Sequence, residues 1–232
     1  MSSPLTNLKS GPVNDVTPKA GRASPRCIPA SALHRAIVIG ASTGGPQALA
    51  VVLDGLRPAL PLVPVFVVQH IPSEFTEVIA EHIQKATGLP THSARQGEGV
   101  EKGQIYLSPG NVHLAIACVG ASPVTVLVDE PSENFCKPSV DVLFRSAARC
   151  YGAGLVGIIL TGMGSDGLAG SRAIVEAGGK VIAQDAASST VWGMPGAVVN
   201  GGLAHAVLPV GKIAPAACAL LNTPQFVHEK TL

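Results

Sequence analysis

The chain has 232 residues, of which 47% are hydrophobic and 13% are charged, so it can bury a large core and form one domain, with or without an appendage. Lysine and arginine (16) nearly balance aspartate and glutamate (15), which gives no electrostatic reason to expect a nucleic acid as partner. Aromatic residues make up only 3%, which disfavours an all-β sandwich and a base-stacking platform. The composition favours a compact α/β fold.

Residues 1–34 differ from the rest of the chain. They contain five prolines, four basic residues and one acid, without a helical or alternating hydrophobic period, and we expect a flexible arm or linker there. The domain itself is expected over residues 35–222, followed by a C-terminal tail over residues 223–232.

The sequence predicts a cytoplasmic protein without membrane insertion. A bilayer span needs about 18 uninterrupted apolar residues, and arginine and prolines break the most apolar stretch, between Leu56 and Val68. No signal-peptide pattern opens the chain. In a reducing compartment, the five cysteines are expected to be free thiols that pack as small apolar residues.

Strand and helix signals alternate along residues 35–222, which predicts a doubly wound, mostly parallel sheet with helices on both faces. The buried parallel strands are predicted at residues 36–40, 64–69, 155–160 and 180–184. Helices are predicted from Pro46 to Leu56, after Ser73, after Ser139, and near residues 168–177, 195 and 211–221. Three further short strands, at residues 104–108, 112–117 and 124–128, have no long helices between them and predict an antiparallel insertion at the edge of the sheet.

A glycine-rich turn, Gly40-Ala41-Ser42-Thr43-Gly44-Gly45, follows the first predicted strand and precedes a helix. Read as G-x-S-x-G, it is a nucleophile elbow that projects the Ser42 hydroxyl above the sheet, with a helix N-terminus behind it to stabilise an oxyanion. The turn also resembles the dinucleotide-binding turn of short-chain dehydrogenases. That alternative is disfavoured because neither tyrosine of the chain is followed four residues later by the lysine that those enzymes need.

Two more polar groups follow strands that end at the same predicted edge. His70 follows the second strand, and Asp166 lies in the glycine-rich turn after the strand at 155–160. Because open α/β sheets place ligand-contacting groups at the carboxyl ends of their strands, Ser42, His70 and Asp166 are candidates for a Ser-His-Asp triad. The order nucleophile-acid-histidine, usual in α/β-hydrolases, would instead select His205 as the base. No H-x-H or H-E-x-x-H pair supports a metal site.

Six segments together resemble the catalytic domain of the CheB-type protein-glutamate methylesterases of bacterial chemotaxis. They are GASTGGPQAL, VVQHIP, YLSPGNVHL, PSVDVLFRSAA, GIILTGMGSDG and AQDAASSTVWGMPGAVV, spread over residues 35–221. The resemblance implies Ser42 as nucleophile, His70 as general base and Asp166 as the acid that orients it. It also implies that Thr43 and Met163 line the site, with a backbone N–H near Met163 in the oxyanion hole.

The activity implied by this resemblance is hydrolysis of glutamyl methyl esters on the cytoplasmic helices of methyl-accepting chemoreceptors, joined in many members by deamidation of glutamines. Neither a metal nor a cofactor is implied, and we expect a monomer. Residues 1–34 stand where typical members carry a receiver domain, so phosphorylation control within the chain is not expected. The loop Asn134-Phe135-Cys136-Lys137 departs from the Arg/His-rich loop of the family, which bears on receptor recognition but not on the chemistry. The alternative from another class is a catalytically silent module that docks on receptor helices.

Overall fold

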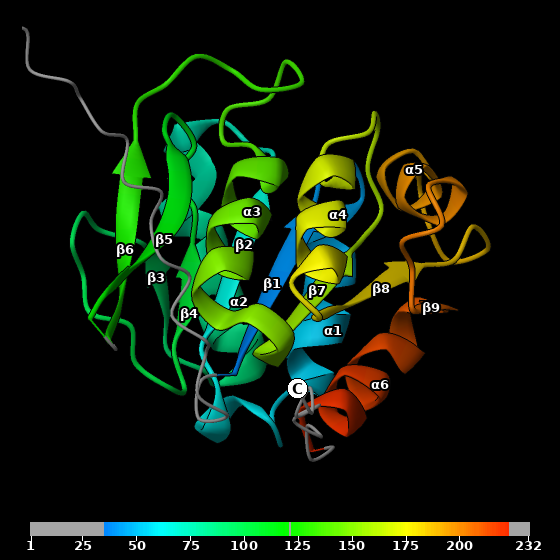
Figure 1. The fold of residues 1–232 in the computed structure, drawn as a ribbon, viewed down its shortest axis with the longest axis horizontal. Helices are drawn as coiled ribbons and strands as arrows, with labels where there is room; N and C mark the ends of the chain where they lie inside the picture. Colours follow the sequence, from blue (N-terminus) through cyan, green and yellow to red (C-terminus); the bar gives the residue numbers. More distant parts are fainter. Residues whose placement is uncertain (1–34, 121, 223–232) are drawn as a thin grey trace, which may run out of the picture.

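The computed structural model describes residues 35–120 and 122–222, which form a seven-stranded sheet and a separate two-stranded sheet. In the large sheet the strand order is β3-β4-β2-β1-β7-β8-β9, and every neighbouring pair is parallel. Its strands are β1 (Ala36–Ala41), β2 (Val65–Gln69), β3 (Thr91–Ser93), β4 (Ile105–Leu107), β7 (Leu155–Ile159), β8 (Lys180–Gln184) and β9 (Ala206–Leu208). The small sheet consists of β5 (His113–Val119) and β6 (Ser122–Val128) (Figure 1).

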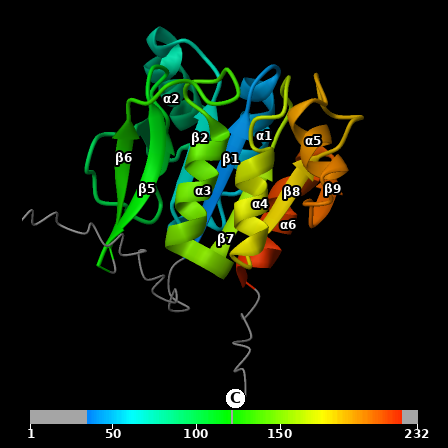
Figure 2. The same cartoon turned by 45° about the horizontal axis from the view of Figure 1, so that its top comes forward.

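Helices cover both faces of the large sheet, which confirms the predicted doubly wound α/β fold. They are α1 (Gly45–Gly55), α2 (Thr76–Thr87), α3 (Val140–Tyr151), α4 (Leu168–Glu176), α5 (Met194–Asn200) and α6 (Val210–Asn222), with short 3-10 turns at Leu60–Leu62, Ser73–Phe75 and Gly152–Gly154. Successive strand residues point to opposite faces, so Ile37 and Ile39 of β1 pack with α1, α2 and α6, whereas Ala36 and Val38 pack with α3, α4 and α5. Figures 1 and 2 show α3 and α4 lying over one face.

The predicted antiparallel insertion is only partly correct. Strands β5 and β6 do pair antiparallel, from His113↔Val128 to Val119↔Ser122. Strand β4, predicted as part of the same insertion, instead pairs parallel with β2 and β3 inside the large sheet. The prediction was wrong because β4 has three residues and is reached from β3 by a crossover without a helix. That crossover hydrogen-bonds to β6, where Thr125 N donates to Glu98 O at 2.9 Å.

A disulfide ties the small sheet to the helix beside it. Cys118 near the end of β5 is bonded to Cys150 in the last turn of α3, with their Cα atoms 5.8 Å apart. The expectation that all cysteines are free thiols is therefore wrong for this pair, because the fold brings together two residues that are 32 positions apart. Cys136 and Cys218 are free thiols, and Cys27 lies outside the described residues.

None of the helices that the structure describes combines the length and the apolar character that a bilayer crossing requires. The predicted arm over residues 1–34 and the predicted tail over residues 223–232 both lie outside the described residues.

Candidate active site

The strand order reverses next to β1, whose neighbours are β2 on one side and β7 on the other. All three strands are parallel, so their carboxyl ends meet at one edge of the sheet. The chain leaves β1 at Ser42, β2 at His70 and β7 at the turn that contains Asp166. Crevices at such a switch point are where open α/β sheets bind their ligands, and the structure brings the three predicted groups to this edge.

The Ser42 turn is fixed by contacts with both neighbouring strand ends. Ser42 N donates to Thr161 O at 3.0 Å, and Ser42 O accepts from Gln69 Nε2 at 2.9 Å. A Cβ at Gly162 would lie 2.8 Å from Ser42 Cβ, so only glycine lets the turn after β7 approach the serine this closely. Gly44, with φ 78°, supplies the left-handed residue that begins α1. These contacts hold Ser42 at the sheet edge with its side chain partly exposed.

His70 and Asp166 form the central polar pair of the site. His70 Nε2 lies 2.9 Å from Asp166 Oδ2, and Asp166 is only 2% exposed. Burial by itself raises the pKa of the Asp166 carboxyl, but the hydrogen bonds that it accepts outweigh burial and hold this pKa below its usual value. The carboxylate is therefore ionised at neutral pH, as the orienting acid of a triad must be.

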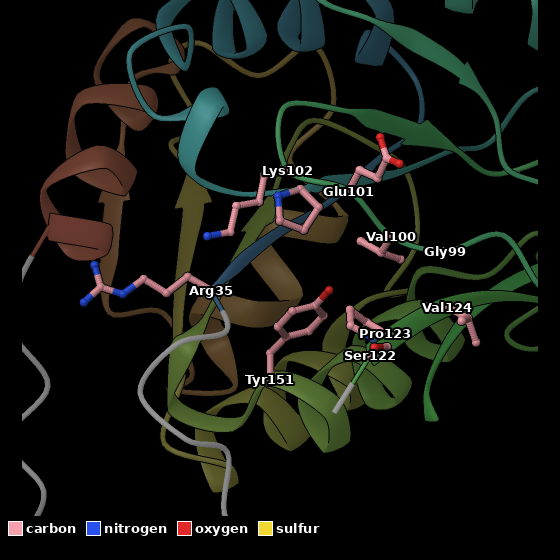
Figure 3. Close-up of a pocket in the computed structure, with 10 residues that line it drawn as sticks. Arg35, Gly99, Val100, Glu101, Lys102, Ser122, Pro123, Val124 and Tyr151 are labelled. Carbon is pink, nitrogen blue, oxygen red and sulfur yellow. The ribbon is translucent and has the colours of Figure 1, made fainter. Parts of the chain in front are cut away.

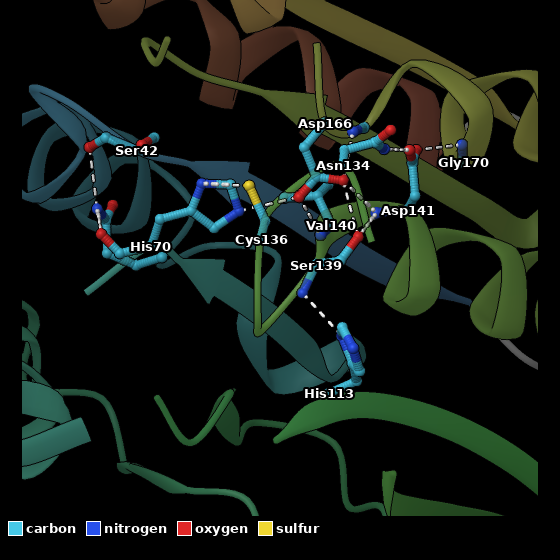
Figure 4. A network of polar contacts seen from close by, with 12 residues as sticks. Ser42, His70, His113, Asn134, Cys136, Ser139, Val140, Asp141, Asp166 and Gly170 are labelled. Atoms are coloured by element: carbon cyan, nitrogen blue, oxygen red, sulfur yellow. Dashed lines mark hydrogen bonds and ion pairs between the residues drawn. The ribbon is translucent and has the colours of Figure 1, made fainter. Parts of the chain in front are cut away.

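The Asp166 carboxylate accepts four further hydrogen bonds, and three of them come from the start of α3 (Figure 4). Their donors are Val140 N (2.7 Å), Ser139 Oγ (2.8 Å), Gly167 N (3.0 Å) and Asp141 N (3.1 Å). Both carboxylate oxygens are occupied, so the acid cannot rotate away from His70 without breaking several bonds. No pattern in the sequence indicates that the start of α3, about 25 residues earlier in the chain, holds Asp166.

The orientation of the His70 ring determines which nitrogen can act as a base. An ionised carboxylate only accepts hydrogen bonds, so Nε2 carries the proton in the pair with Asp166, and Nδ1 is the unprotonated nitrogen of the neutral ring. The serine-protease arrangement is the reverse, with Nδ1 toward the acid. Among the described residues, no hydrogen bond joins His70 to the Ser42 hydroxyl. Instead, His70 Nδ1 lies 3.8 Å from the sulfur of Cys136.

The alternative base, His205, is not brought to this edge. His205 is exposed and lies just before β9, and its N–H donates to Val181 O at 2.7 Å. Val181 is the second residue of β8, so His205 lies near the amino end of the parallel sheet, opposite the carboxyl end where Ser42 and Asp166 are found. The structure therefore groups Asp166 with His70 and not with His205.

A separate cavity of about 410 Å³ opens at the amino end of the sheet (Figure 3). Arg35 and Pro64, which immediately precede β1 and β2, line it together with Lys102 and Tyr151. It contains none of the predicted site residues, so the candidate active site is the opposite edge.

Known proteins resemble this chain in sequence and in fold. The family model described as CheB methylesterase matches residues 37–217. The chain belongs to the CheB methylesterase family. A relative from Rhodopseudomonas palustris named "Protein-glutamate methylesterase/protein-glutamine glutaminase of group 2 operon" is 50% identical over 181 residues, which cover 78% of this chain and 46% of the relative. A protein-glutamate methylesterase/protein-glutamine glutaminase from Nitrobacter winogradskyi is 52% identical over 183 residues, covering 79% and 43% of the two chains.

The chain thus spans about half the length of the curated relatives that it matches. It also resembles the crystal structure of the CheB methylesterase catalytic domain from Thermotoga maritima. The TM-score is 0.78 at 36% sequence identity, and the match covers 81% of this chain and 98% of that one.

In this CheB methylesterase-family chain, Thr43 and Met163 lie on the two turns that meet at the edge. Both side chains are exposed, Met163 to 74%. Within the described part of the chain, the backbone N–H groups of Thr43 and Met163 have no hydrogen-bond partner, and Met163 directly follows the glycine that contacts Ser42. Two such N–H groups beside a serine hydroxyl are suited to hold an oxyanion.

Next to His70, this family member carries a tight turn over Glu133-Asn134-Phe135-Cys136. Glu133 and Cys136 exchange two backbone hydrogen bonds, of 3.1 and 2.8 Å. The two central residues, Asn134 and Phe135, have φ 50° and 62°, which is the geometry of a type I′ turn. Asn134 Nδ2 also donates to Asp141 Oδ2 at 2.7 Å. The turn holds Cys136 beside the histidine and leaves Phe135 fully exposed.

The loop around Cys136 can be recognised in the sequence, but the contact of its thiol with His70 cannot. The thiol is not a competing nucleophile, because burial, together with the charges of Asp166 and Asp141, raises its pKa to about 11. Burial also raises the pKa of Asp141 to about 6, whereas the pKa of Asp166 is lowered.

Proposed function

We propose that this chain is a serine hydrolase that removes methyl groups from glutamyl methyl esters on the helices of chemoreceptors. The observation that carries the proposal is the buried, ionised Asp166 hydrogen-bonded to His70 at the same sheet edge as the Ser42 turn. The names of the curated relatives, protein-glutamate methylesterase/protein-glutamine glutaminase, support the same reaction.

In the proposed mechanism, Nδ1 of His70 takes the proton of the Ser42 hydroxyl as the oxygen attacks the ester carbonyl. Asp166 keeps its charge and stabilises the imidazolium that forms. The N–H groups of Thr43 and Met163 hold the oxyanion of the tetrahedral intermediate. Methanol leaves with the proton from Nδ1. Water then attacks the glutamyl-enzyme while Nδ1 takes its proton, and the Ser42 oxygen leaves with that proton. Glutamine deamidation follows the same route with ammonia as the leaving group.

The substrate in this proposal is a protein surface, not a small ester. Phe135 is fully exposed and Met163 is 74% exposed, and in this proposal both contact an apolar part of the receptor surface. We further propose residues 35–222 as the catalytic domain, between an arm at 1–34 and a tail at 223–232. It acts as a cytoplasmic monomer whose hydrolysis step uses no metal or cofactor.

The deciding experiment incubates the protein with methyl-labelled receptor membranes and measures the methanol released. Ser42→Ala should abolish release, a loss on the order of 10³–10⁶-fold, whereas Ser165→Ala, an exposed serine in the turn before Asp166, should keep the wild-type rate. A serine-directed inhibitor should add its mass at Ser42. Tight receptor binding by the wild type without methanol release would establish the silent docking module instead.

A further inference from the structure

The proposed mechanism gives no role to Cys136, a side chain of metal-ligating type that lies beside His70. Cys136 Sγ lies 3.8 Å from His70 Nδ1, and Cys136, His70 and Asp166 each place one ligand-type atom within 4.8 Å of the other two. Figure 4 shows the His70 ring pointing toward Cys136 and Asp166. The backbone pairing of Cys136 with Glu133 holds this residue beside His70, so the three side chains are already close together.

A thiolate, an imidazole and a carboxylate together form a ligand set that suits zinc. Zinc binds sulfur at about 2.3 Å and nitrogen or oxygen at about 2.0–2.2 Å, and sites with three protein ligands keep a fourth position for water. Tetrahedral bonds of those lengths separate the ligand atoms by about 3.3–3.7 Å. The observed separations, from 2.9 Å between His70 and Asp166 to no more than 4.8 Å, are within about 1 Å of that range.

The charges around the cluster also favour a cation. Asp166 is buried and ionised, and Asp141 adds to the negative potential at Cys136. The negative charges of Asp166 and Asp141 disfavour an isolated Cys136 thiolate, but they attract a divalent cation. Once bound, the cation would be the largest charge at the site and would stabilise the thiolate.

We propose that Cys136, His70 and Asp166 form a binding site for a soft divalent cation of the zinc type, and that its occupation switches the hydrolase off. On binding, the Cys136 thiol releases its proton to solvent and forms the sulfur–metal bond. The His70 proton moves from Nε2 to Nδ1 as Nε2 and Asp166 Oδ2 coordinate the ion, and no oxidation state changes. With Nδ1 protonated, His70 cannot accept the proton of Ser42. The inhibitory effect rests on the proposed function, whereas the binding site does not.

Binding is tested directly on the tag-free full chain. Calorimetric titration with Zn²⁺ should show one ion bound per chain at this site, and Co²⁺ should give the absorption band of a thiolate–cobalt bond. Cys136→Ala should weaken zinc binding by about 100-fold or more and remove the cobalt band. Cys218→Ala is the matched control, because it removes the other free thiol in the described residues, and it should bind like the wild type. Absence of the thiolate band in the wild type, or equal zinc affinity in Cys136→Ala, would overturn the site.

The effect on activity is measured separately. Zinc should inhibit methanol release by the wild type, and a chelator should restore it. With each protein compared with its own zinc-free rate, Cys136→Ala should resist the zinc concentration that inhibits the wild type. Equal inhibition of wild type and Cys136→Ala would refute the switch. A wild type that binds zinc through Cys136 but hydrolyses no ester would refute the proposed function and the switch while leaving the binding site established.

Discussion

Replacing His70 by glutamine separates its chemical role from its structural one. His70 gives one of the five hydrogen bonds that the Asp166 carboxylate accepts, so the buried charge keeps four donors in His70→Gln. Losing one hydrogen bond to a charged group costs about 1.5–3 kcal/mol, and the glutamine amide can donate in its place. The variant should therefore stay folded. Because glutamine cannot accept the Ser42 proton, methanol release should fall by about 10⁴–10⁶-fold.

The assay compares initial rates of methanol release and thermal melts for wild type, His70→Gln and His205→Gln. His205→Gln should match the wild type in both measurements, because His205 is exposed near the amino end of β8. A folded His70→Gln protein that keeps more than roughly one hundredth of the wild-type rate would refute the assignment, since general-base catalysis alone contributes at least about 10²-fold. A large loss in His205→Gln instead would move the base to that residue.

Three further predictions concern stability and recognition. The pKa of Asp141 is raised to about 6, so between about pH 4 and pH 6 the folded state binds more protons than the unfolded state and stability falls as pH rises. In urea melts at about pH 4.5 and pH 7, Asp141→Asn should remove this fall, which is roughly 1–3 kcal/mol; an unchanged pH slope would contradict it. Reducing the Cys118–Cys150 disulfide, whose cysteines are 32 residues apart, should lower the free energy of unfolding by about 3–4 kcal/mol. The double alanine variant should show no effect of dithiothreitol on its Tm. Phe135→Ala should raise KM for receptor membranes about tenfold without changing hydrolysis of a small methyl ester, and equal KM values would exclude Phe135 from recognition.

The parts of the fold that could be predicted are those where burial alone determines the local pattern of apolar residues. Strands β1, β2 and β7 are buried on both faces, so they read as continuous apolar runs between turn residues. The candidate site follows from them, because parallel strands bring Ser42, His70 and Asp166 to one edge.

The remaining features depend on contacts between distant segments. Strands β3 and β4 have three residues each, too few for a period to show, and their connection lacks the helix that marks a parallel crossover. The Cys118–Cys150 pairing depends on how the small sheet packs on α3. The His70 ring orientation is set by where the Asp166 oxygens lie, which no local pattern encodes. The predicted arm and tail remain predictions.

The way in which Asp166 is held affects how a chain of this kind would lose its activity. The first N–H groups of any helix lack hydrogen-bond acceptors within the helix. At the start of α3, the Asp166 carboxylate, which belongs to another segment, accepts from Val140 N and Asp141 N. Losing this acid would leave buried donors unpaired and would also disable the base. Losing the Ser42 hydroxyl would leave the hydrogen bonds of Ser42 to Thr161, Gly45 and Gln69 in place, because they all use the serine backbone. A descendant that drifts from catalysis toward simple docking would therefore be expected to change Ser42 first and to keep Asp166 longest. In a comparison of related chains, an aspartate at position 166 would therefore indicate an intact fold. Only Ser42 and His70 together would indicate an active enzyme.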